Sequence, residues 1–300
     1  MIEIESRGCV ALIRDLGAEL TSFRVGDDEV IWQSRPEVWK GSAPILFPII
    51  GRLKGGGYTH GGRRYDLAKH GLVRSRRLTV SERGPGTATL TLKADDQTRA
   101  CYPFDFVFRV TFTLGERRNN RSLRISYQVQ NDGDEEMYFS LGSHPAIRLP
   151  LDQAPLQDYY LELGVPETLG RHRIVDGLLS AASEPFLDNE REIPLTEHLF
   201  DDDALIFKSV ESTSVSVKCR RSARAVRIDT GGAPHLGLWA KPGADYVCIE
   251  PWWGYDDPAD AADGELRHKP GELRHKPGIQ PLSPGKTFET AITITLTPLQ

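Results

Sequence analysis

Short stretches of alternating apolar and polar residues recur along nearly the whole chain, and this period of two restricts the fold more than any other feature. Clear examples span residues 10–13, 19–25 and 106–114, and turn residues such as Gly, Asp, Asn and Pro separate them. Side chains alternate across a β-strand, so such stretches fit one face of a pleated sheet. No window carries a helical stripe over three turns, and residues 36–39 and 201–204 are at most single helical turns. The pattern predicts an all-β protein.

Further strands are expected where Val, Ile, Thr and aromatic residues gather, because these residues fit a half-buried pleated surface. We expect them at 87–93, 123–131, 214–219, 225–229, 246–249 and 288–296. Many short strands joined by turns predict a large antiparallel sandwich or barrel. No linker divides the sequence, so residues 1–300 are expected to form one domain. The Pro- and Gly-rich stretch 256–285 is predicted to be an irregular, exposed loop before the last strand.

A perfect tandem repeat of seven residues lies inside this loop. Residues 264–270 and 271–277 both read Gly-Glu-Leu-Arg-His-Lys-Pro. The repeat is too short for a solenoid unit, which needs about 20 or more residues. Because lengthening an exposed loop costs little free energy, we interpret the repeat as a dispensable duplication. Its two histidines, seven residues apart, are not expected to bind a metal.

Composition and charge narrow the classes of partner. The net charge is −5, so no basic field attracts nucleic acid or an anionic membrane. Four scattered cysteines without a Cys-x-x-Cys pair indicate reduced core thiols. No apolar run approaches the ~18 residues of a membrane helix, and the first residues do not form a signal peptide. We therefore expect a soluble cytoplasmic protein without nucleic-acid or membrane partners.

Residues 248–257, Cys-Ile-Glu-Pro-Trp-Trp-Gly-Tyr-Asp-Asp, are the stretch best suited to chemistry. A strand is expected to end here, because Pro251 lacks a backbone donor and interrupts regular pairing. Glu250 then lies in a partly apolar wall, which raises a carboxyl pKa towards neutrality and suits proton transfer. The adjacent indoles, including that of Trp252, offer flat faces for a sugar ring. The alternative is a glutamate that caps a turn over core tryptophans.

Three more polar residues stand beside conformationally special ones. Arg52 follows an apolar run bracketed by two prolines, and a guanidinium on such a rigid base suits bidentate contacts to hydroxyls or anions. His70 precedes a glycine, and His144 precedes a proline that favours extended geometry. A lone histidine is more often structural than catalytic. Two of them, together with Glu250, favour a site for proton transfer.

Five motifs, taken in order, resemble those of the aldose 1-epimerase (galactose mutarotase) superfamily, and most of all its bacterial LacX-like branch. They are Gly-Arg-Leu at 51–53, His-Gly-Leu-Val-Arg at 70–74, Ser-His-Pro-Ala at 143–146, Leu-Trp-Ala-Lys-Pro-Gly at 238–243 and Cys-Ile-Glu-Pro-Trp at 248–252. The resemblance covers nearly the whole chain. It implies a single β-supersandwich domain whose concave face binds a hexopyranose, with neither a metal nor an organic cofactor.

The resemblance also implies catalytic roles. Glu250 would take the proton of the anomeric hydroxyl, His144 would protonate the ring oxygen, and His70 would assist by hydrogen bonding. A base and an acid of this kind, a carboxylate and an imidazolium, are sufficient for mutarotation.

Binding roles follow in the same way. Arg52 would hold sugar hydroxyls, and so would one acidic residue of 201–203, with Asp203 preferred. Trp239 and Trp252 are expected to contact the sugar, and Arg74 would meet an anion if the sugar carries a phosphate at C6.

The sequence departs from the galactose-active branch at two motifs. Ala146 and Ile147 follow the His-Pro pair where that branch has aromatic residues, and Glu250 is followed by Pro-Trp-Trp. The identity of the sugar, its phosphorylation and the oligomeric state are therefore left open.

Three other functions fit the same residues. The chain could bind or sense sugars without catalysis, because fold does not fix function. Two histidines and a carboxylate are also the ligand set of non-haem iron proteins. A glycoside hydrolase would need a second carboxylate about 5–10 Å from Glu250, for which Asp203 and Asp256 are candidates.

Overall fold

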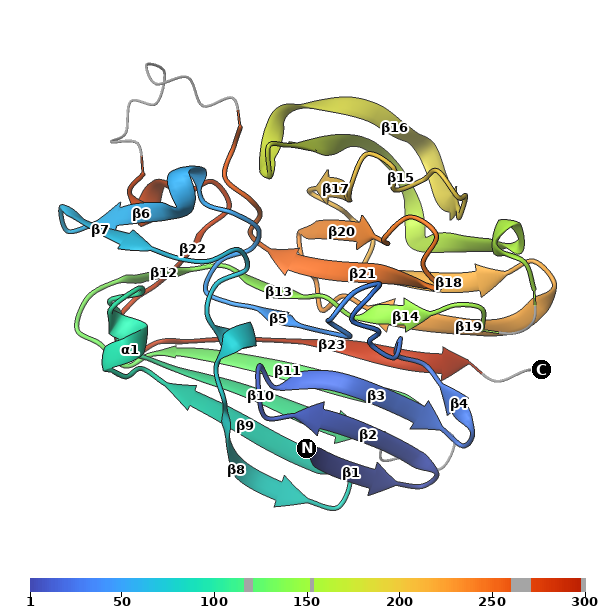
Figure 1. The fold of residues 1–300 in the computed structure, drawn as a ribbon, viewed down its shortest axis with the longest axis horizontal. Helices are drawn as coiled ribbons and strands as arrows, with labels where there is room; N and C mark the ends of the chain where they lie inside the picture. The colour runs from blue at the N-terminus through green and yellow to red at the C-terminus, as the bar shows by residue number, and fades with distance from the viewer. Residues whose placement is uncertain (116–120, 152–153, 260–270, 298–300) are drawn as a thin grey trace.

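A computed structural model describes residues 1–115, 121–151, 154–259 and 271–297, and these residues form an all-β fold as the sequence predicts (Figure 1). Its main element is a fifteen-stranded antiparallel sheet with the path β5-β13-β21-β20-β17-β15-β18-β19-β23-β11-β10-β9-β8, to which β14 adds beside β21 and β16 beside β15. In chain order its strands are β5 (Ile45–Leu46), β8 (Thr79–Gly84), β9 (Thr87–Lys93), β10 (Phe106–Leu114), β11 (Ser122–Asn131), β13 (Leu141–Ser143), β14 (Ala146–Arg148), β15 (Tyr159–Val175), β16 (Leu178–Pro194), β17 (Leu205–Lys208), β18 (Ser214–Cys219), β19 (Ser222–Asp229), β20 (His235–Trp239), β21 (Tyr246–Trp253) and β23 (Thr287–Thr297).

Three smaller sheets and a few helical turns complete the described structure. The sheets consist of β1 (Ile2–Ser6), β2 (Cys9–Arg14), β3 (Glu19–Val25) and β4 (Asp28–Glu29); of β6 (Gly57–His60) and β7 (Arg63–Asp66); and of β12 (Met137–Phe139) and β22 (Gln280–Leu282). The helical turns are α1 (Asp96–Arg99), η1 (Lys54–Gly56), η2 (Val73–Ser75), η3 (Leu156–Asp158) and η4 (Leu273–His275). No helix in the four described ranges has the length and apolar character needed to cross a membrane.

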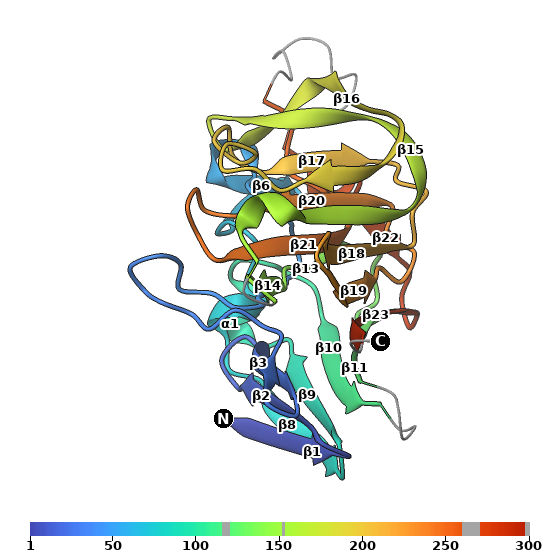
Figure 2. The same cartoon turned by 90° about the vertical axis from the view of Figure 1, so that its right-hand side faces the viewer.

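The layers follow from the period of two in the strands. In β2 every second side chain is buried, and the buried side of the β1–β4 sheet packs against β9 and β10 (Figure 2). At the other end of the molecule the long β15–β16 hairpin arches over β17 and β20 (Figure 2). Alternation thus places one face of each sheet in the core, as the sequence predicts.

An aromatic cluster in the core anchors the segment that leads to Arg52. The ring of Phe47 lies 5.4, 5.1 and 5.9 Å, centroid to centroid, from those of Phe106, Phe108 and Phe139. A buried phenylalanine contributes about 1.5–3 kcal/mol through the water it excludes, so Phe47 fixes the chain just before it turns towards the surface.

Strand β21 is the main correction to the sequence-based strand assignments. The sequence predicts that the strand ends at Pro251, but β21 continues to Trp253, and its residues from Cys248 to Trp252 pair with β20. On its other edge β21 pairs with β14 up to Cys248 and with β13 from Trp252 onward. Pro251 falls between these two pairings, where a missing N–H removes no ladder hydrogen bond.

Both expected single helical turns also take another form. Residues 36–39 form a turn closed by a bridge between Arg35 and Trp39, and residues 201–203 form a turn ahead of β17. Helix α1, which the sequence analysis missed, begins at the side chain of Asp95, which accepts a hydrogen bond from the Thr98 N–H. A run of four helical residues is too short to show a periodic stripe.

The stretch 256–285 is not simply an exposed loop. The second copy of the heptad packs on the protein: Leu273 is buried, and Thr59 forms a bridge with Glu272. Lys276 is also buried, and its Nζ lies 2.9 Å from the Asp257 carboxylate Oδ1 and 2.6 Å from the Tyr255 carbonyl oxygen. The first copy, residues 264–270, lies outside the described residues.

Removing one heptad should nevertheless be tolerated. The two copies are identical, so deleting either gives the same chain, and the remaining copy can occupy the packed position. We expect a melting temperature within a few degrees of the original, measured by thermal unfolding. In the shortened chain, Leu273→Ala should lower the melting temperature by about 5 °C or more, because no second copy of the heptad is left to supply the buried leucine. A large fall in melting temperature on deletion of one heptad alone would contradict this prediction.

Candidate active site

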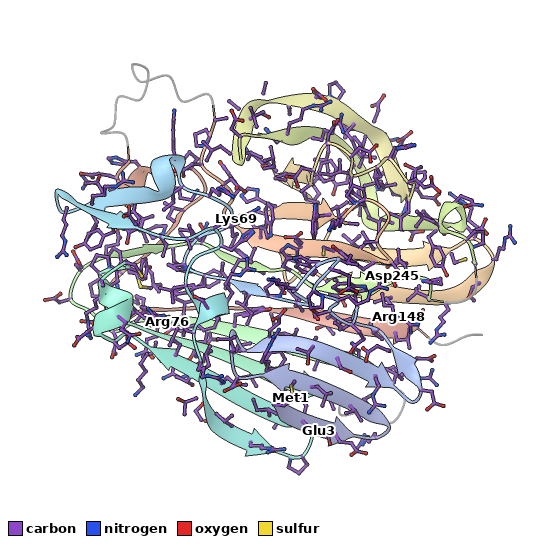
Figure 3. All side chains as sticks on the ribbon, in the orientation of Figure 1. Met1, Glu3, Lys69, Arg76, Arg148 and Asp245 are labelled. Carbon is purple, nitrogen blue, oxygen red and sulfur yellow. The ribbon has the colours of Figure 1, made fainter. Side chains whose placement is uncertain are left out.

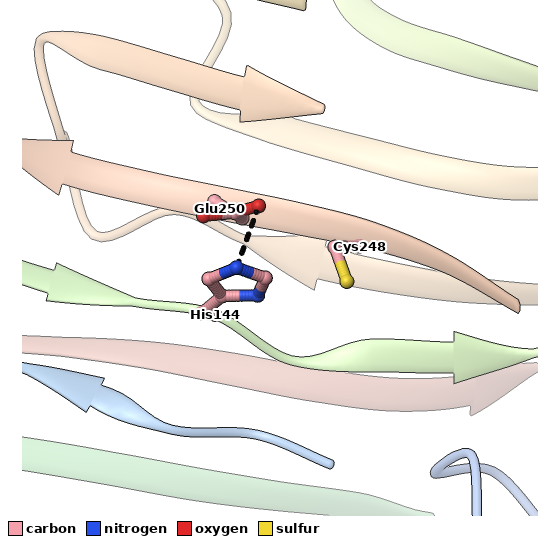
Figure 4. A group of neighbouring side chains, drawn as sticks. All are labelled: His144, Cys248 and Glu250. Carbon is pink, nitrogen blue, oxygen red and sulfur yellow. Dashed lines mark ion pairs between the residues drawn. The ribbon is translucent and has the colours of Figure 1, made fainter. Parts of the chain in front are cut away.

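A break in the pairing of β21 creates the centre of the candidate site. Residues 144–145 leave the ladder between β13 and β14, and the side chain of His144 faces Glu250 across that break. The imidazole Nε2 lies 3.2 Å from the carboxylate Oε1 (Figure 4). The two side chains are 11% and 3% exposed, so the pair is buried. Pro145 has no backbone N–H to donate to a neighbouring strand, which interrupts regular pairing at this break.

Burial sets the electrostatics of Glu250. Removal from water raises the pKa of its carboxyl well above the ordinary value of 4.5. The ammonium of Lys69 opposes this rise, whereas the carboxylates of Asp256 and Asp203 reinforce it. The indole N–H of Trp252 also favours the ionised form, although its geometry falls short of a full hydrogen bond. The net direction is towards a carboxyl that keeps its proton.

The same burial acts on His144 in the opposite sense. Burial, together with the positive charges of Arg74 and Lys69, lowers the pKa of the imidazole to about 3. Both shifts favour neutral side chains, with one proton shared between Glu250 and His144. The surroundings therefore oppose both charges of the expected carboxylate–imidazolium pair.

His70 lies beside this pair, on a strained loop. Its ring meets that of His144 edge-on, with centroids 6.1 Å apart. The Nδ1 atom accepts a hydrogen bond of 3.1 Å from the Gly51 N–H, so the neutral ring carries its proton on Nε2 and can donate there. His70 has a φ of 66° and Gly71 one of 76°. A side chain on Gly71 would clash with the Phe47 carbonyl, 2.3 Å from its Cβ, so glycine is required.

Three exposed cations surround the histidines. Burial lowers the pKa of His70, and the charges of Lys69, Arg74 and Arg52 lower it further. Figure 3 places Lys69 between the β6–β7 hairpin and the strands that carry the site. Arg52 and Lys69 line a pocket of about 540 Å³ next to His70. The sequence motifs predict Arg52 and Arg74 as binding residues but not Lys69, because no local pattern distinguishes it from other surface lysines.

Asp256 holds the Arg52 loop in place. Its Oδ1 accepts a 2.9 Å hydrogen bond from the Arg52 N–H, and it is buried. A Cβ on Gly51 would lie 1.7 Å from this carboxylate, so only glycine allows the approach. Because this carboxylate is buried and accepts a hydrogen bond from the Arg52 backbone, it is poorly suited to be the second catalytic carboxylate of a glycoside hydrolase.

Aromatic rings form one wall of the site. The ring of Trp39 stacks on that of His144, with centroids 5.1 Å apart, and Trp239 meets the same imidazole edge-on at 6.0 Å. Trp39 was missed by the sequence analysis, which assigned it only to a possible helical turn. The available signal was a tryptophan in a short polar segment between Pro36 and Gly41.

Cys248 shares the face of β21 on which Glu250 lies. Ligand atoms of His144, Cys248 and Glu250 lie within 4.8 Å of one another (Figure 4). The metal alternative predicts a ligand set of Glu250, His70 and His144. In the structure the third group near Glu250 and His144 is the Cys248 thiol and not the His70 imidazole. Burial raises the pKa of Cys248, so its thiol keeps its proton and a metal would have to displace it.

Comparison with known proteins decides the family. The profile described as Aldose 1-epimerase matches residues 1–294. This chain belongs to the aldose 1-epimerase family. The plasmid-encoded protein LacX of Lactococcus lactis subsp. lactis is 31% identical over 265 residues, which cover 84% of this chain and 87% of LacX.

Solved structures agree with this family assignment. A galactose mutarotase related enzyme from Lactobacillus acidophilus superposes with a TM-score of 0.89 at 36% identity, covering 100% of this chain and 98% of that one. A galactose mutarotase-like protein from Lactobacillus casei superposes with a TM-score of 0.88 at 28% identity, covering 99% and 100%. The expected family and the β-supersandwich fold are therefore confirmed.

In this member of the aldose 1-epimerase family, the three aspartates at 201–203 have different partners. Asp201 pairs with His198, and Asp202 pairs with Arg173. The Asp203 carboxylate accepts a 2.8 Å hydrogen bond from the Ala204 N–H, and it is the member of the run whose charge reaches Glu250.

Trp252 does not offer the expected stacking face. Its side chain is 4% exposed and packs with Leu46 and Ile206 in a small apolar cluster. Its ring lies against Gly142 and Gly237 on the two neighbouring strands, since a Cβ on either would come within 3 Å of it. The indole is buried in this structure, so it packs beside Glu250 on the same face of β21.

The buried carboxyl predicts a gain in stability when Glu250 is replaced by glutamine. A pKa above 4.5 in the folded state means that the folded protein binds this proton more tightly than the unfolded chain. Stability is then lost as pH rises from 4.5 through the folded pKa. Glu250→Gln should melt above the wild type at pH 8, and the difference should shrink towards pH 4.5. The exposed Glu82→Gln is the control, with no such pH-dependent difference. A lower melting temperature for Glu250→Gln at pH 8 would contradict the direction of the shift.

Proposed function

We propose that this protein is a mutarotase that interconverts the α and β anomers of a hexopyranose by general acid–base catalysis. The supporting observation is the buried contact between Glu250 and His144, 3.2 Å between carboxylate and imidazole. Mutarotation exchanges protons at the anomeric hydroxyl oxygen and the ring oxygen, which are bonded to the same carbon. An acid and a base that serve both oxygens must therefore be close neighbours, as these two are.

The proton relay follows from the shared proton of the pair. One member takes the proton of the anomeric hydroxyl while the other delivers its proton to the ring oxygen, and the ring opens. Rotation about the bond to the anomeric carbon and the reverse transfers close the ring as the other anomer. In this proposal the shared proton first passes from Glu250 to His144, so that Glu250 is the base and His144 the acid. The pair ends each cycle with the one proton it began with, so the reaction runs in both directions and requires no cofactor.

Neighbouring residues would bind and orient the sugar. The Nε2–H of His70 can donate to the ring oxygen region, since Nδ1 is held by Gly51. Arg52, Arg74 and Asp203 are exposed at the rim of the buried pair and can contact sugar hydroxyls. Trp239 is partly exposed and gives an apolar face for the C–H groups of the ring.

Substitution of the pair tests the proposed reaction. Glu250→Gln and His144→Asn keep polar side chains but cannot exchange a proton as the relay requires. Each should lower the catalysed rate of anomer exchange by about 10²–10⁴-fold, with much smaller changes in sugar binding. The rate is measured by polarimetry or exchange NMR on a panel of aldoses, after subtraction of spontaneous mutarotation.

The double variant and His70 provide the internal comparisons. Because the pair acts as one unit, the double variant should be little slower than the slower single variant. Replacing His70 should slow exchange by less than replacing His144. A wild-type protein that binds sugars without accelerating exchange would identify a non-catalytic sugar-binding protein instead. A near-normal rate in Glu250→Gln would exclude the proposed base.

A further inference from the structure

A second group of titratable side chains lies on the same face of the sheet as Glu250, outside the candidate active site. It consists of His172 on β15, Lys208 on β17, His235 on β20 and Tyr255 just after β21, and we call it the basic cluster. Its strands are neighbours in the sheet (Figure 1).

The strand register places the basic cluster beside the acid–base pair. Lys208 is opposite His235, and His235 is opposite Trp252. Trp252 lies two residues from Glu250, so its side chain points to the same side of β21. His172 is opposite Ile206, which is itself opposite Gly237, the partner of Glu250. All of these side chains therefore share one face, and His235 is displaced along the strands from Glu250 by roughly 7 Å.

The members of the cluster contact one another. The Lys208 Nζ lies 4.3 Å from the centre of the Tyr255 ring, and the His235 ring meets the same tyrosine edge-on at 4.9 Å. The Ser209 N–H points at the His235 Nδ1 at 3.4 Å, which leaves Nε2 as a hydrogen-bond donor. These contacts fix an ammonium and an imidazole donor on one side of an aromatic ring.

The basic groups of the cluster repel one another's positive charge. Burial, together with the charges of Lys208 and His172, lowers the pKa of His235 to about 4. Burial lowers the pKa of Lys208 as well, and burial together with Lys208 lowers that of His172.

The nearest acidic groups on β15 and β16 are engaged elsewhere. Arg173 pairs with both Glu184 and Asp202, and Arg171 pairs with Glu184. Since side chains alternate along β15, these arginines point away from the face that carries His172. Among the ion pairs of the described residues, none joins His172, Lys208 or His235 to a carboxylate.

We propose that the basic cluster binds an anionic group, a carboxylate or a phosphate, carried by the sugar whose anomeric carbon lies at Glu250 and His144. The inference rests on the proposed mutarotase function and names its substrate class as acidic sugars. The C6 substituent of a hexopyranose, carried by the carbon on the other side of the ring oxygen from the anomeric carbon, would reach along the strands towards His235. Charge-assisted hydrogen bonds from Lys208 and His235 would hold it.

Kinetics of matched sugars test the substrate class. Anomer exchange is measured with glucose, glucuronate and glucose 6-phosphate for the wild type, for Lys208→Met and for His235→Gln. Lys93→Met, an exposed lysine on β9, is the control. We expect the wild type to favour at least one acidic sugar over glucose by tenfold or more in kcat/KM. Either cluster variant should remove most of this preference while leaving the rate on glucose unchanged, and the control should change neither.

Binding without turnover separates this inference from the proposed function. Imidazole resonances of His172 and His235 are followed by NMR during titration with glucose, glucose 6-phosphate and inorganic phosphate. Acidic sugar should shift them towards the protonated state in the wild type but not in Lys208→Met, whether or not the protein accelerates anomer exchange. The inference is overturned if these resonances do not respond to the acidic sugar. It is also overturned if inorganic phosphate binds as tightly as the sugar phosphate, or if the variants slow glucose and acidic sugars equally.

Discussion

The burial of a carboxyl group against an imidazole, Glu250 against His144, is the constraint on which the rest of the site depends. Taking either group out of water opposes its charge, and each side chain is at most 11% exposed. Their contact offsets this cost because one shared proton can serve both groups. An acid–base pair that remains neutral and loaded with one proton is suited to a reaction that returns to its starting protonation state. The fold thus maintains an arrangement that costs stability, as is expected of a site that serves the proposed proton transfer.

Backbone features in β21 and its neighbours make that burial possible. The break between β13 and β14 leaves room for His144, and Pro251 in β21 lies opposite the same break. Glycines at 142 and 237 allow the Trp252 ring to lie close to the neighbouring strands, beside Glu250 on the same face of the sheet. Each of these residues would be unfavourable in a regular buried sheet, because proline lacks a donor and glycine lacks a side chain to pack. Together, this proline and these glycines depart from regular sheet packing where the candidate active site lies.

Much of this architecture could be predicted from the sequence, and the limits have a physical origin. The period of two reports which face of a strand is buried, so the all-β fold followed directly. The pairing of β21 with β13 and β14 depends on contacts between residues about 100 positions apart in the sequence, and local patterns cannot predict such contacts. The contact between Trp39 and His144 could not be predicted for the same reason: the two residues are about 100 positions apart, and Trp39 lies in a loop without periodicity. The covered faces of Trp252 and the packed heptad around Leu273 show that residue type alone does not fix exposure.

The dependence of catalysed anomer exchange on pH tests the shared proton most directly. Burial raises the pKa of Glu250 and lowers that of His144 to about 3, which widens the pH range in which the pair holds one proton. The rate, corrected for spontaneous exchange, should therefore stay level across the pH interval from about 4.3 to about 6.5 and extend beyond both ends of it, with its acid limb set by His144 and its alkaline limb by Glu250. An optimum confined between about 4.3 and about 6.5, the ordinary pKa values of glutamate and histidine, would contradict the account.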